Sequence, residues 1–277
     1  TPDFPIRVTK LSHEGRGLVR WGERMLFIDG ALPNELVTVR VTKKSSKTAE
    51  GVAKKILVPS PARGQPECPH ATVCGGCSLQ HLPHQSQIDH KSNTLDELLT
   101  REGIILDQVT RLPPLLGPRL GYRRRARLGV RWVHAKGRVL VGFRERGSNF
   151  IADIDGCPVL DPRIGRSLDQ LETTIAALSA PDRIPQVEVA AGDDTVAIVI
   201  RHLEPLSAAD AEQWVHLAKS TGWHVYLQPK GPDTIARLWP ADGPERLTYR
   251  IGEFGLEYQF AVTDFTQINA AMNRAMM

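Results

Sequence analysis

The chain has 277 residues, of which 41% are hydrophobic, and its formal net charge is +4 at pH 7. This length allows one large domain or two to three small ones with packed cores. No apolar run approaches the roughly 20 residues that cross a bilayer, and no secretory signal pattern is present. We therefore expect a cytoplasmic protein without a membrane partner. Four cysteines are too few for a disulfide scaffold of this size.

The positive charge is concentrated in two blocks. Residues 1–66 contain 12 Lys/Arg against 6 Asp/Glu, and residues 119–146 contain 10 against 1. The other parts are acidic on balance, with 3 against 6 over residues 67–118 and 10 against 18 over residues 147–277. Basic blocks on an acidic chain indicate a polyanion partner, and a solvated charged face without a ligand is the alternative for each block.

The first sixty residues alternate short β-rich runs with turn signals. The runs are IRVTKL, GLVRW, RMLFIDG, ELVTVRVTKK and GVAKKIL. Five short strands predict an OB-like β-barrel, a fold that commonly presents a basic, aromatic-bearing face to nucleic acid. Trp21 offers a stacking surface, whereas Phe27 is better explained as a core residue. The candidate phosphate contacts of this segment are Lys10, Arg16, Arg20, Lys43, Lys44 and Lys47.

The remaining pattern predicts an α+β domain with a largely antiparallel sheet. A Pro-rich stretch over residues 59–67 predicts a domain boundary. Apolar residues at helical spacing predict an amphipathic helix over residues 85–103 that needs a partner surface. Further along, the predicted elements are strands over residues 123–133 and 138–146, a helix over 162–179, a strand pair over 186–202 with a turn at 192–194, a helix over 207–221, and short strands up to residue 262.

The cysteines form the most specific pattern in the chain. Cys68, Cys74 and Cys77 are spaced C-x5-C-x2-C, and Cys157 follows much later in DIDGCPVL. Three local thiolates and one remote thiolate suit a four-cysteine iron-sulfur cluster. The alternatives are a structural zinc site, a C-x-x-C redox pair and four unrelated thiols. Zinc sites usually show a second short knuckle, which is missing here, and a redox pair leaves Cys68 and Cys157 without a role.

Four arginines lie close together in a predicted strand. Alternate residues of a strand face the same side, so Arg123, Arg125 and Arg127 are expected to share a face and Arg124 to oppose them. We interpret the shared face as a phosphate-contacting surface for RNA. The alternative is that these arginines form ion pairs with the acidic remainder of the domain.

Four stretches carry a family resemblance. They are LSHEGRGLVRWGERMLFIDGALPNELVTVRV, CPHATVCGGCSLQHL, YRRRARLGVRW with LVGFRERGSNFIADIDGCPVL, and DFTQINAAMN. In that order they resemble the TRAM barrel, the cluster loop, the central domain and the beginning of the catalytic domain of the uracil-5 RNA methyltransferases that modify 23S ribosomal RNA. The resemblance covers nearly the whole chain.

This resemblance implies a domain order and an activity. A TRAM barrel would occupy residues 1–60, a central domain with a 4Fe-4S cluster residues 61–262, and the start of a Rossmann-like domain residues 263–277. The activity would be methyl transfer from S-adenosylmethionine to C5 of a uridine in 23S ribosomal RNA, through a cysteine adduct at C6. Gln267 would contact the cofactor, Phe265 would line the substrate pocket, and the helix over residues 85–103 would pack on the catalytic domain.

The resemblance also leaves alternatives. The cluster claims all four cysteines, so we expect the chain to be a fragment that lacks the nucleophile. A transfer-RNA substrate is the first alternative, but the TRAM barrel and the cluster favour ribosomal RNA, because family members without them include the transfer-RNA enzymes. The second is a non-catalytic RNA-binding module with a zinc or iron-sulfur staple. We expect no DNA partner and a monomeric protein.

Overall fold

The computed structural model describes residues 2–277, which divide into two compact units. The first unit contains the residues up to Pro114 together with Arg144–Phe150, and the second contains Leu115–Phe143 and Ile151–Met277. No helix among the described residues is long and apolar enough to cross a membrane. The predicted three-domain division at residues 60 and 262 is finer than these two units and stays a prediction.

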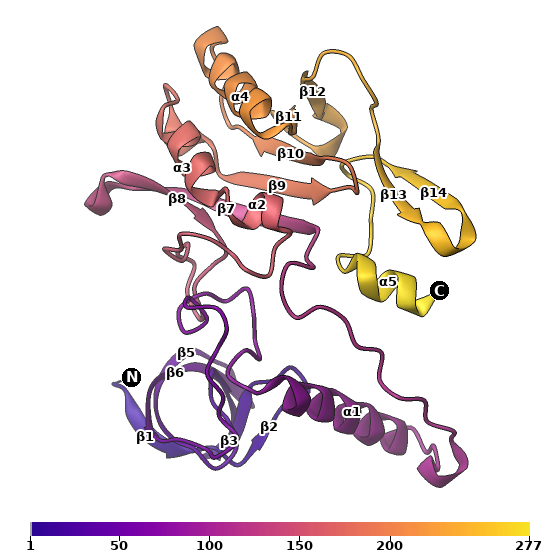
Figure 1. Ribbon diagram of the computed structural model, residues 1–277. Coiled ribbons are helices and arrows are strands. Elements are labelled where there is room, and N and C mark those ends of the chain that lie inside the picture. The colour runs from indigo at the N-terminus through magenta and orange to yellow at the C-terminus, as the bar shows by residue number, and fades with distance from the viewer. Residues whose placement is uncertain (1) are drawn as a thin grey trace. The chain divides into compact units, whose positions relative to one another are not determined.

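The first unit begins with a six-stranded sheet that curls into a barrel, in the order β1-β5-β6-β4-β3-β2 (Figure 1). Alternate residues of the central strands are buried, so one face of each strand fills a shared core around Leu26, Ile28 and Val37. Six strands form instead of the five predicted, because the IRVTKL run changes its pairing partner. The Val8 N–H still donates to the Glu35 carbonyl beside β5 at 2.9 Å, whereas the Thr9 N–H donates to the Leu18 carbonyl of β3 at 3.0 Å. The strands are β1 (Phe4–Arg7), β2 (Lys10–Leu11), β3 (Gly17–Trp21), β4 (Arg24–Asp29), β5 (Leu36–Lys44) and β6 (Thr48–Val58).

Helix α1 (His84–Arg101) follows the cysteine-bearing loop in the same unit and confirms the predicted amphipathic helix. It ends just before Gly103, whose φ of 80° suits a glycine beyond a helix end. None of its residues is buried, and Leu95 and Leu98 are 51% and 42% exposed. Within the described residues, the apolar stripe that suggested a partner surface is therefore exposed at Leu95 and Leu98 and half-buried at Ile88 and Leu99.

The second unit is built on a six-stranded sheet in the order β12-β11-β10-β9-β7-β8. Every neighbouring pair is antiparallel except β10 and β11, which are parallel and are joined through helix α4. The prediction of a largely antiparallel sheet in an α+β fold is confirmed. The strands are β7 (Arg125–Val133), β8 (Arg138–Gly142), β9 (Gln186–Ala191), β10 (Val196–Arg201), β11 (His224–Gln228) and β12 (Ala236–Trp239).

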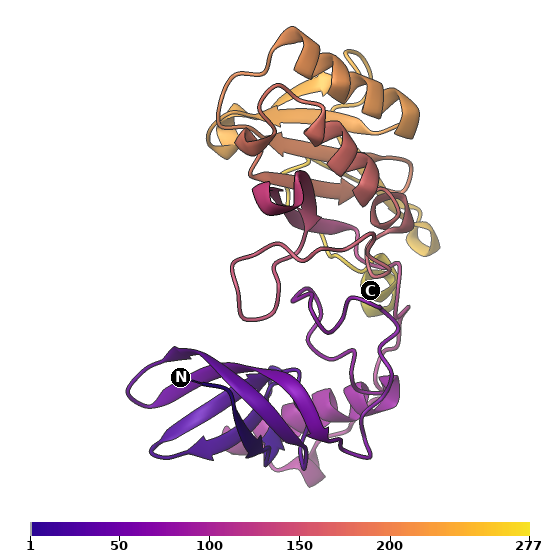
Figure 2. The ribbon, with the colours of Figure 1, turned by 90° about the vertical axis from the view of Figure 1, so that its left-hand side faces the viewer.

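Helices α3 (Leu168–Ala176) and α4 (Ala208–Thr221) cover one face of this sheet (Figure 2). Helix α4 confirms the helix predicted over residues 207–221, and Ser207 and Asp210 close a capping box at its start. The helix predicted over residues 162–179 is instead split into α2 (Pro162–Gly165) and α3. The split occurs because the Gly165 carbonyl accepts the N–H of Cys157 at 2.9 Å. It therefore does not accept a hydrogen bond from an N–H four residues later, as it would in a continuous helix.

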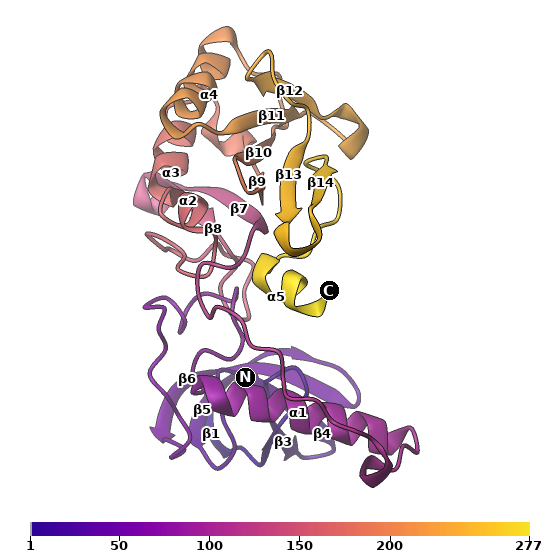
Figure 3. The same ribbon diagram turned by 45° about the vertical axis from the view of Figure 1, so that its right-hand side comes forward.

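The hairpin of β13 (Leu247–Ile251) and β14 (Leu256–Phe260) lies on the opposite side of the sheet (Figure 3). Leu247 and Phe260 pack there with Val199 and Tyr226 in one buried cluster. The chain then turns and ends in the described helix α5 (Ala270–Met276). The second unit also contains four short 3-10 turns, η2 (His134–Lys136), η3 (Pro181–Arg183), η4 (Pro232–Thr234) and η5 (Gly252–Phe254), among the described residues. The first unit contains η1 (Leu106–Gln108).

Candidate functional site

Cys68, Cys74 and Cys77 lie on one loop of the first unit, and all three are half-buried. Tight turns shape the loop, because the His70 carbonyl accepts the N–H of Cys74 at 2.8 Å. The N–H of Gly76 points at the sulfur of Cys74, with a nitrogen to sulfur distance of 3.4 Å. An N–H directed at sulfur favours the thiolate, which is the form that ligates iron. The local geometry therefore suits a ligand loop.

Arg146 fastens this loop to the segment Arg144–Phe150 of the same unit. Its guanidinium donates to the carbonyls of Ala71 and Cys77, with Nε at 3.1 Å from the first. Its backbone N–H donates to the Val73 carbonyl at 2.9 Å, and the Gly75 N–H donates to the Arg144 carbonyl at 2.8 Å. In the sequence Arg146 is only one charge of a basic block, because its partners are backbone carbonyls about 70 residues away.

His81 closes the cysteine loop and is only 6% exposed. Burial lowers the pKa of its imidazole to about 4, and the positive charges of Arg63 and Arg146 act in the same direction. The imidazole is therefore neutral at physiological pH. The positive charge next to His81 therefore comes from Arg63 and Arg146 and not from His81 itself.

The fourth predicted ligand, Cys157, belongs to the second unit, where its N–H is bonded to the Gly165 carbonyl. Gly165 is needed at this approach, because a Cβ there would lie 2.2 Å from the Cys157 carbonyl oxygen. Over residues 2–277 the structure assembles no group of three His, Cys, Asp or Glu side chains that could hold a metal ion. The four-cysteine cluster is thus not shown and stays a prediction.

The predicted phosphate contacts of the barrel are mostly exposed, and two of them lie against aromatic rings. The Lys44 ammonium lies 4.9 Å from the centroid of Trp21, which itself stacks on Phe4. The Arg16 guanidinium lies 5.1 Å from the centroid of Phe27. Phe27, which was expected to be a core residue, is half-buried. The other four side chains are exposed; they are Lys10, Arg20, Lys43 and Lys47.

Only part of the arginine face that the strand pattern predicted lies within a strand: Arg125 and Arg127 alternate with buried residues on β7 (Arg125–Val133). Strand β7 begins at Arg125, so Arg123 precedes it, and the Arg123 guanidinium lies over the Phe143 ring. Arg124 pairs with Asp193 at 2.5 Å. Arg127 is 69% exposed and pairs with Glu188 at 2.9 Å. The ion pairs with acidic residues, which were the alternative to RNA contact, are therefore present at two of the four positions.

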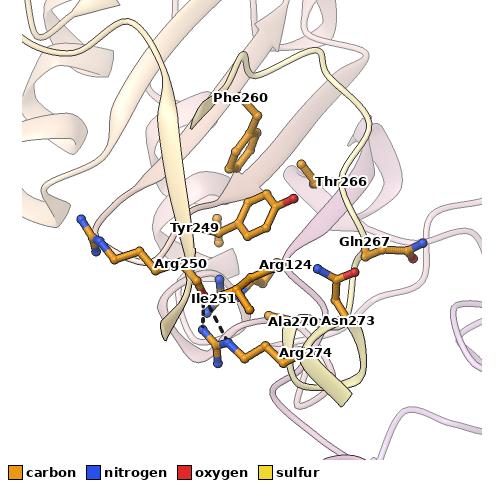
Figure 4. A pocket seen from close by; sticks show the side chains of 11 residues that line it. Arg124, Tyr249, Arg250, Ile251, Phe260, Thr266, Gln267, Ala270, Asn273 and Arg274 are labelled. Carbon is orange, nitrogen blue, oxygen red and sulfur yellow. Dashed lines mark hydrogen bonds between the residues drawn. The ribbon is translucent and has the colours of Figure 1, made fainter. Parts of the chain in front are cut away.

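The two residues implied by family resemblance lie on the segment before α5. Gln267 lines a pocket of the second unit together with Arg124, Tyr249 and Asn273 (Figure 4). The Arg274 guanidinium donates two hydrogen bonds to the Arg250 carbonyl, from Nε and Nη2, each at 3.3 Å. Phe265 is 84% exposed, so its ring is available to a partner surface. The pocket itself is walled by arginine, aromatic and amide side chains.

The sequence is similar to a known domain family and to known RNA methyltransferases. Residues 4–54 match the TRAM domain family. A 23S rRNA (uracil(1939)-C(5))-methyltransferase RlmD from Alcanivorax borkumensis is 47% identical over 277 residues, which is all of this chain and 62% of the relative. The corresponding protein from Hahella chejuensis is 45% identical over 98% of this chain and 60% of its own length. The family resemblance is confirmed along the whole chain.

The chain spans about 60% of the length of these curated methyltransferase relatives. A solved structure, that of a Pyrococcus abyssi tRNA (uracil-54, C5)-methyltransferase in complex with S-adenosyl-L-homocysteine, matches with a TM-score of 0.68. It is 21% identical and covers 98% of this chain and 63% of that protein, which supports the mixed α+β fold. The predicted start of a Rossmann-like domain at residues 263–277 is not supported, since that stretch holds a loop and α5. The comparisons do not show the cluster either.

Proposed function

We propose that this chain is part of an S-adenosylmethionine-dependent methyltransferase that acts on C5 of a uridine in 23S ribosomal RNA. The observation that carries the proposal is the 47% identity to a 23S rRNA uracil-C5 methyltransferase over the full chain. The TRAM match and the exposed lysines of the barrel support an RNA substrate. A cytoplasmic location follows from a ribosomal substrate.

The proposed reaction proceeds through a cysteine that adds to C6 of the uracil, which activates C5 for the methyl group. A base then removes the C5 proton and the cysteine leaves. We assign no nucleophile among the four cysteines of this chain. Gln267 is proposed as a contact to the cofactor, and the exposed Phe265 ring as a wall of the substrate pocket.

We further propose that the four cysteines bind a 4Fe-4S cluster. The proposal rests on their spacing, on the half-buried thiols and on the N–H directed at Cys74. Iron and sulfide analysis of protein purified without oxygen tests it, with about four of each per chain and a broad visible band expected. One zinc per chain in colourless protein would show a structural zinc site instead of the cluster. That result would favour the non-catalytic RNA-binding module.

The activity is tested by incubating the full-length protein of which this chain is part with labelled S-adenosylmethionine and separate 23S ribosomal RNA and transfer-RNA transcripts. We expect 5-methyluridine in the ribosomal transcript only. Methylation of the transfer RNA would show that transfer RNA is the substrate class instead. Transfer RNA is included because the Pyrococcus abyssi protein of similar fold is a tRNA methyltransferase. RNA binding without any methylation would leave the non-catalytic module.

Replacing Lys43 and Lys44 with alanine is expected to weaken RNA binding and its salt dependence. Both side chains are exposed on β5, and Lys44 lies against the Trp21 ring. Loss of two phosphate contacts lowers the slope of log affinity against log salt by about 1 to 2. Filter binding over a range of salt concentrations measures this. The control is the double alanine variant of Lys54 and Lys55, which are exposed on β6 of the same barrel; equal slopes for both variants would remove the assignment.

A further inference from the structure

Arg125 holds a distant part of the second unit through two backbone carbonyls. Its guanidinium donates to the Val262 carbonyl at 2.7 Å and also to the Asp264 carbonyl. These partners are 137 and 139 residues away in sequence. A guanidinium can serve two acceptors at once because its donors form a rigid planar fork, which the ammonium of lysine cannot reproduce.

The held carbonyls belong to a closed turn. The Asp264 N–H donates to the Ala261 carbonyl at 2.9 Å, and the Asp264 carboxylate accepts the Ala261 N–H at 2.7 Å. Local hydrogen bonds therefore fix the shape of this turn, while Arg125 fixes its place on the sheet.

A second anchor follows four residues later. The backbone N–H of Arg124 donates to the Ile268 carbonyl at 2.9 Å, and Arg123 forms an isolated antiparallel bridge with Asn269. Residues 265–267 are thus a three-residue span between two attachments to the start of β7. This span contains both Phe265 and Gln267.

We propose that Arg125 is a positioning residue that sets the place of Phe265 and Gln267 for cofactor and substrate binding. The inference rests on the proposed function, since it assigns Arg125 a role in the same reaction. It also separates Arg125 from Arg127, which was predicted to share its RNA-contacting face. Arg127 is 69% exposed and its ion pair is with Glu188 on the neighbouring strand β9, so it leaves the span untouched.

The test compares Arg125→Ala with Arg127→Ala in the full-length protein. S-adenosylhomocysteine is the calorimetric probe, and hydrogen exchange of peptides covering residues 261–269 reports the span directly. We expect Arg125→Ala to lower the affinity for S-adenosylhomocysteine about tenfold, the scale of one lost charged hydrogen bond. The rate of hydrogen exchange in residues 261–269 should increase in the same variant. Arg127→Ala should match wild type in both measurements.

Arg125→Lys gives a second reading if the alanine variant folds poorly. Lysine keeps the positive charge but lacks the planar set of donors that binds two carbonyls. The probe affinity and the hydrogen-exchange rate of this variant should therefore be intermediate between those of wild type and Arg125→Ala. Probe affinity and exchange in both Arg125 variants equal to those of Arg127→Ala would overturn the inference. Wild-type protein that does not bind the probe would instead contradict the proposed function, and the exchange measurement would still decide whether Arg125 holds the span.

Discussion

Replacing Glu35 with glutamine is expected to lower the free energy of unfolding of the barrel by about 2 to 3 kcal/mol, because it breaks a buried ion pair from one side. The Glu35 side chain is fully buried, while Arg63 is 23% exposed. Hydrogen exchange of peptides from β4 and β5 at increasing denaturant concentration reports the barrel and measures the loss.

The size of this effect follows from the number of donors that meet the Glu35 carboxylate. Arg63 donates from Nε at 2.6 Å and from Nη2 at 2.8 Å. The backbone N–H groups of Leu32 and Ser60 donate at 2.8 and 3.1 Å. A glutamine offers a single oxygen and turns an NH2 group toward these donors, so several of them lose their partner.

The same carboxylate gives the barrel a pH-dependent stability. Burial raises the pKa of Glu35, but the hydrogen bonds from Arg63, Leu32 and Ser60 lower it more, and the pKa lies below its ordinary value of 4.5. The stabilisation is therefore complete above pH 4.5 and is lost as the pH falls through the lower, folded-state pKa. Glu35→Gln should remove this dependence.

Glu50→Gln is the matched control for Glu35→Gln. Glu50 is on the same barrel and pairs with Lys43 and Arg16, but its side chain is 43% exposed. An exposed pair of this kind contributes about 0 to 1 kcal/mol. Equal losses for the two glutamine variants would show that the burial of Glu35 is not what makes it important.

Replacing Arg146 with alanine is expected to remove most of the iron from protein that carries the proposed cluster. The guanidinium holds the carbonyls of Ala71 and Cys77 on either side of Cys74, so its loss frees the loop that presents three of the thiolates. A loop that must be ordered at the moment of ligation binds more weakly than one already in place. Iron content and the rate of bleaching in air measure the effect.

Arg144→Ala is the control for Arg146→Ala. Arg144 is exposed and meets the loop through its backbone carbonyl, which the substitution leaves in place. Its side chain reaches only the Asn149 side chain, at 3.4 Å. Iron retention by Arg146→Ala at the level of Arg144→Ala would contradict the role given to Arg146, and wild-type protein without iron would contradict the cluster itself.

The secondary structure was largely predictable because it depends on local patterns. Short β-rich runs bounded by turn signals identified β3, β4 and β5, and the Gly-Asp-Asp turn identified the β9–β10 pair. The breaks within predicted elements were not predictable. The first run changes its pairing partner after Val8, when the Thr9 N–H donates to the Leu18 carbonyl of β3. The Gly165 carbonyl bonds outside its helix to the N–H of Cys157, which lies upstream in the sequence.

The arginine block shows why a candidate site is harder to predict than a strand. Ten positive charges within 28 residues resemble a phosphate-binding surface, yet Arg125 and Arg146 donate to carbonyls of their own units. Charge counts contain no information about neutral acceptors, and every residue carries a carbonyl. The cysteine pattern was visible because its spacing is itself the signal.

The first unit is discontinuous in the chain, since Arg144–Phe150 belongs to it while the residues on both sides do not. A gene piece that stops at Pro114 would encode the barrel, the cysteines and α1, but not Arg146 or the carbonyl of Arg144. The Ala71 and Cys77 carbonyls and the Gly75 N–H would then face water instead of their partners. Such a piece is a poor reagent for studying the cysteine loop in isolation, whereas one that supplies residues 144–150 through a short linker restores the missing contacts.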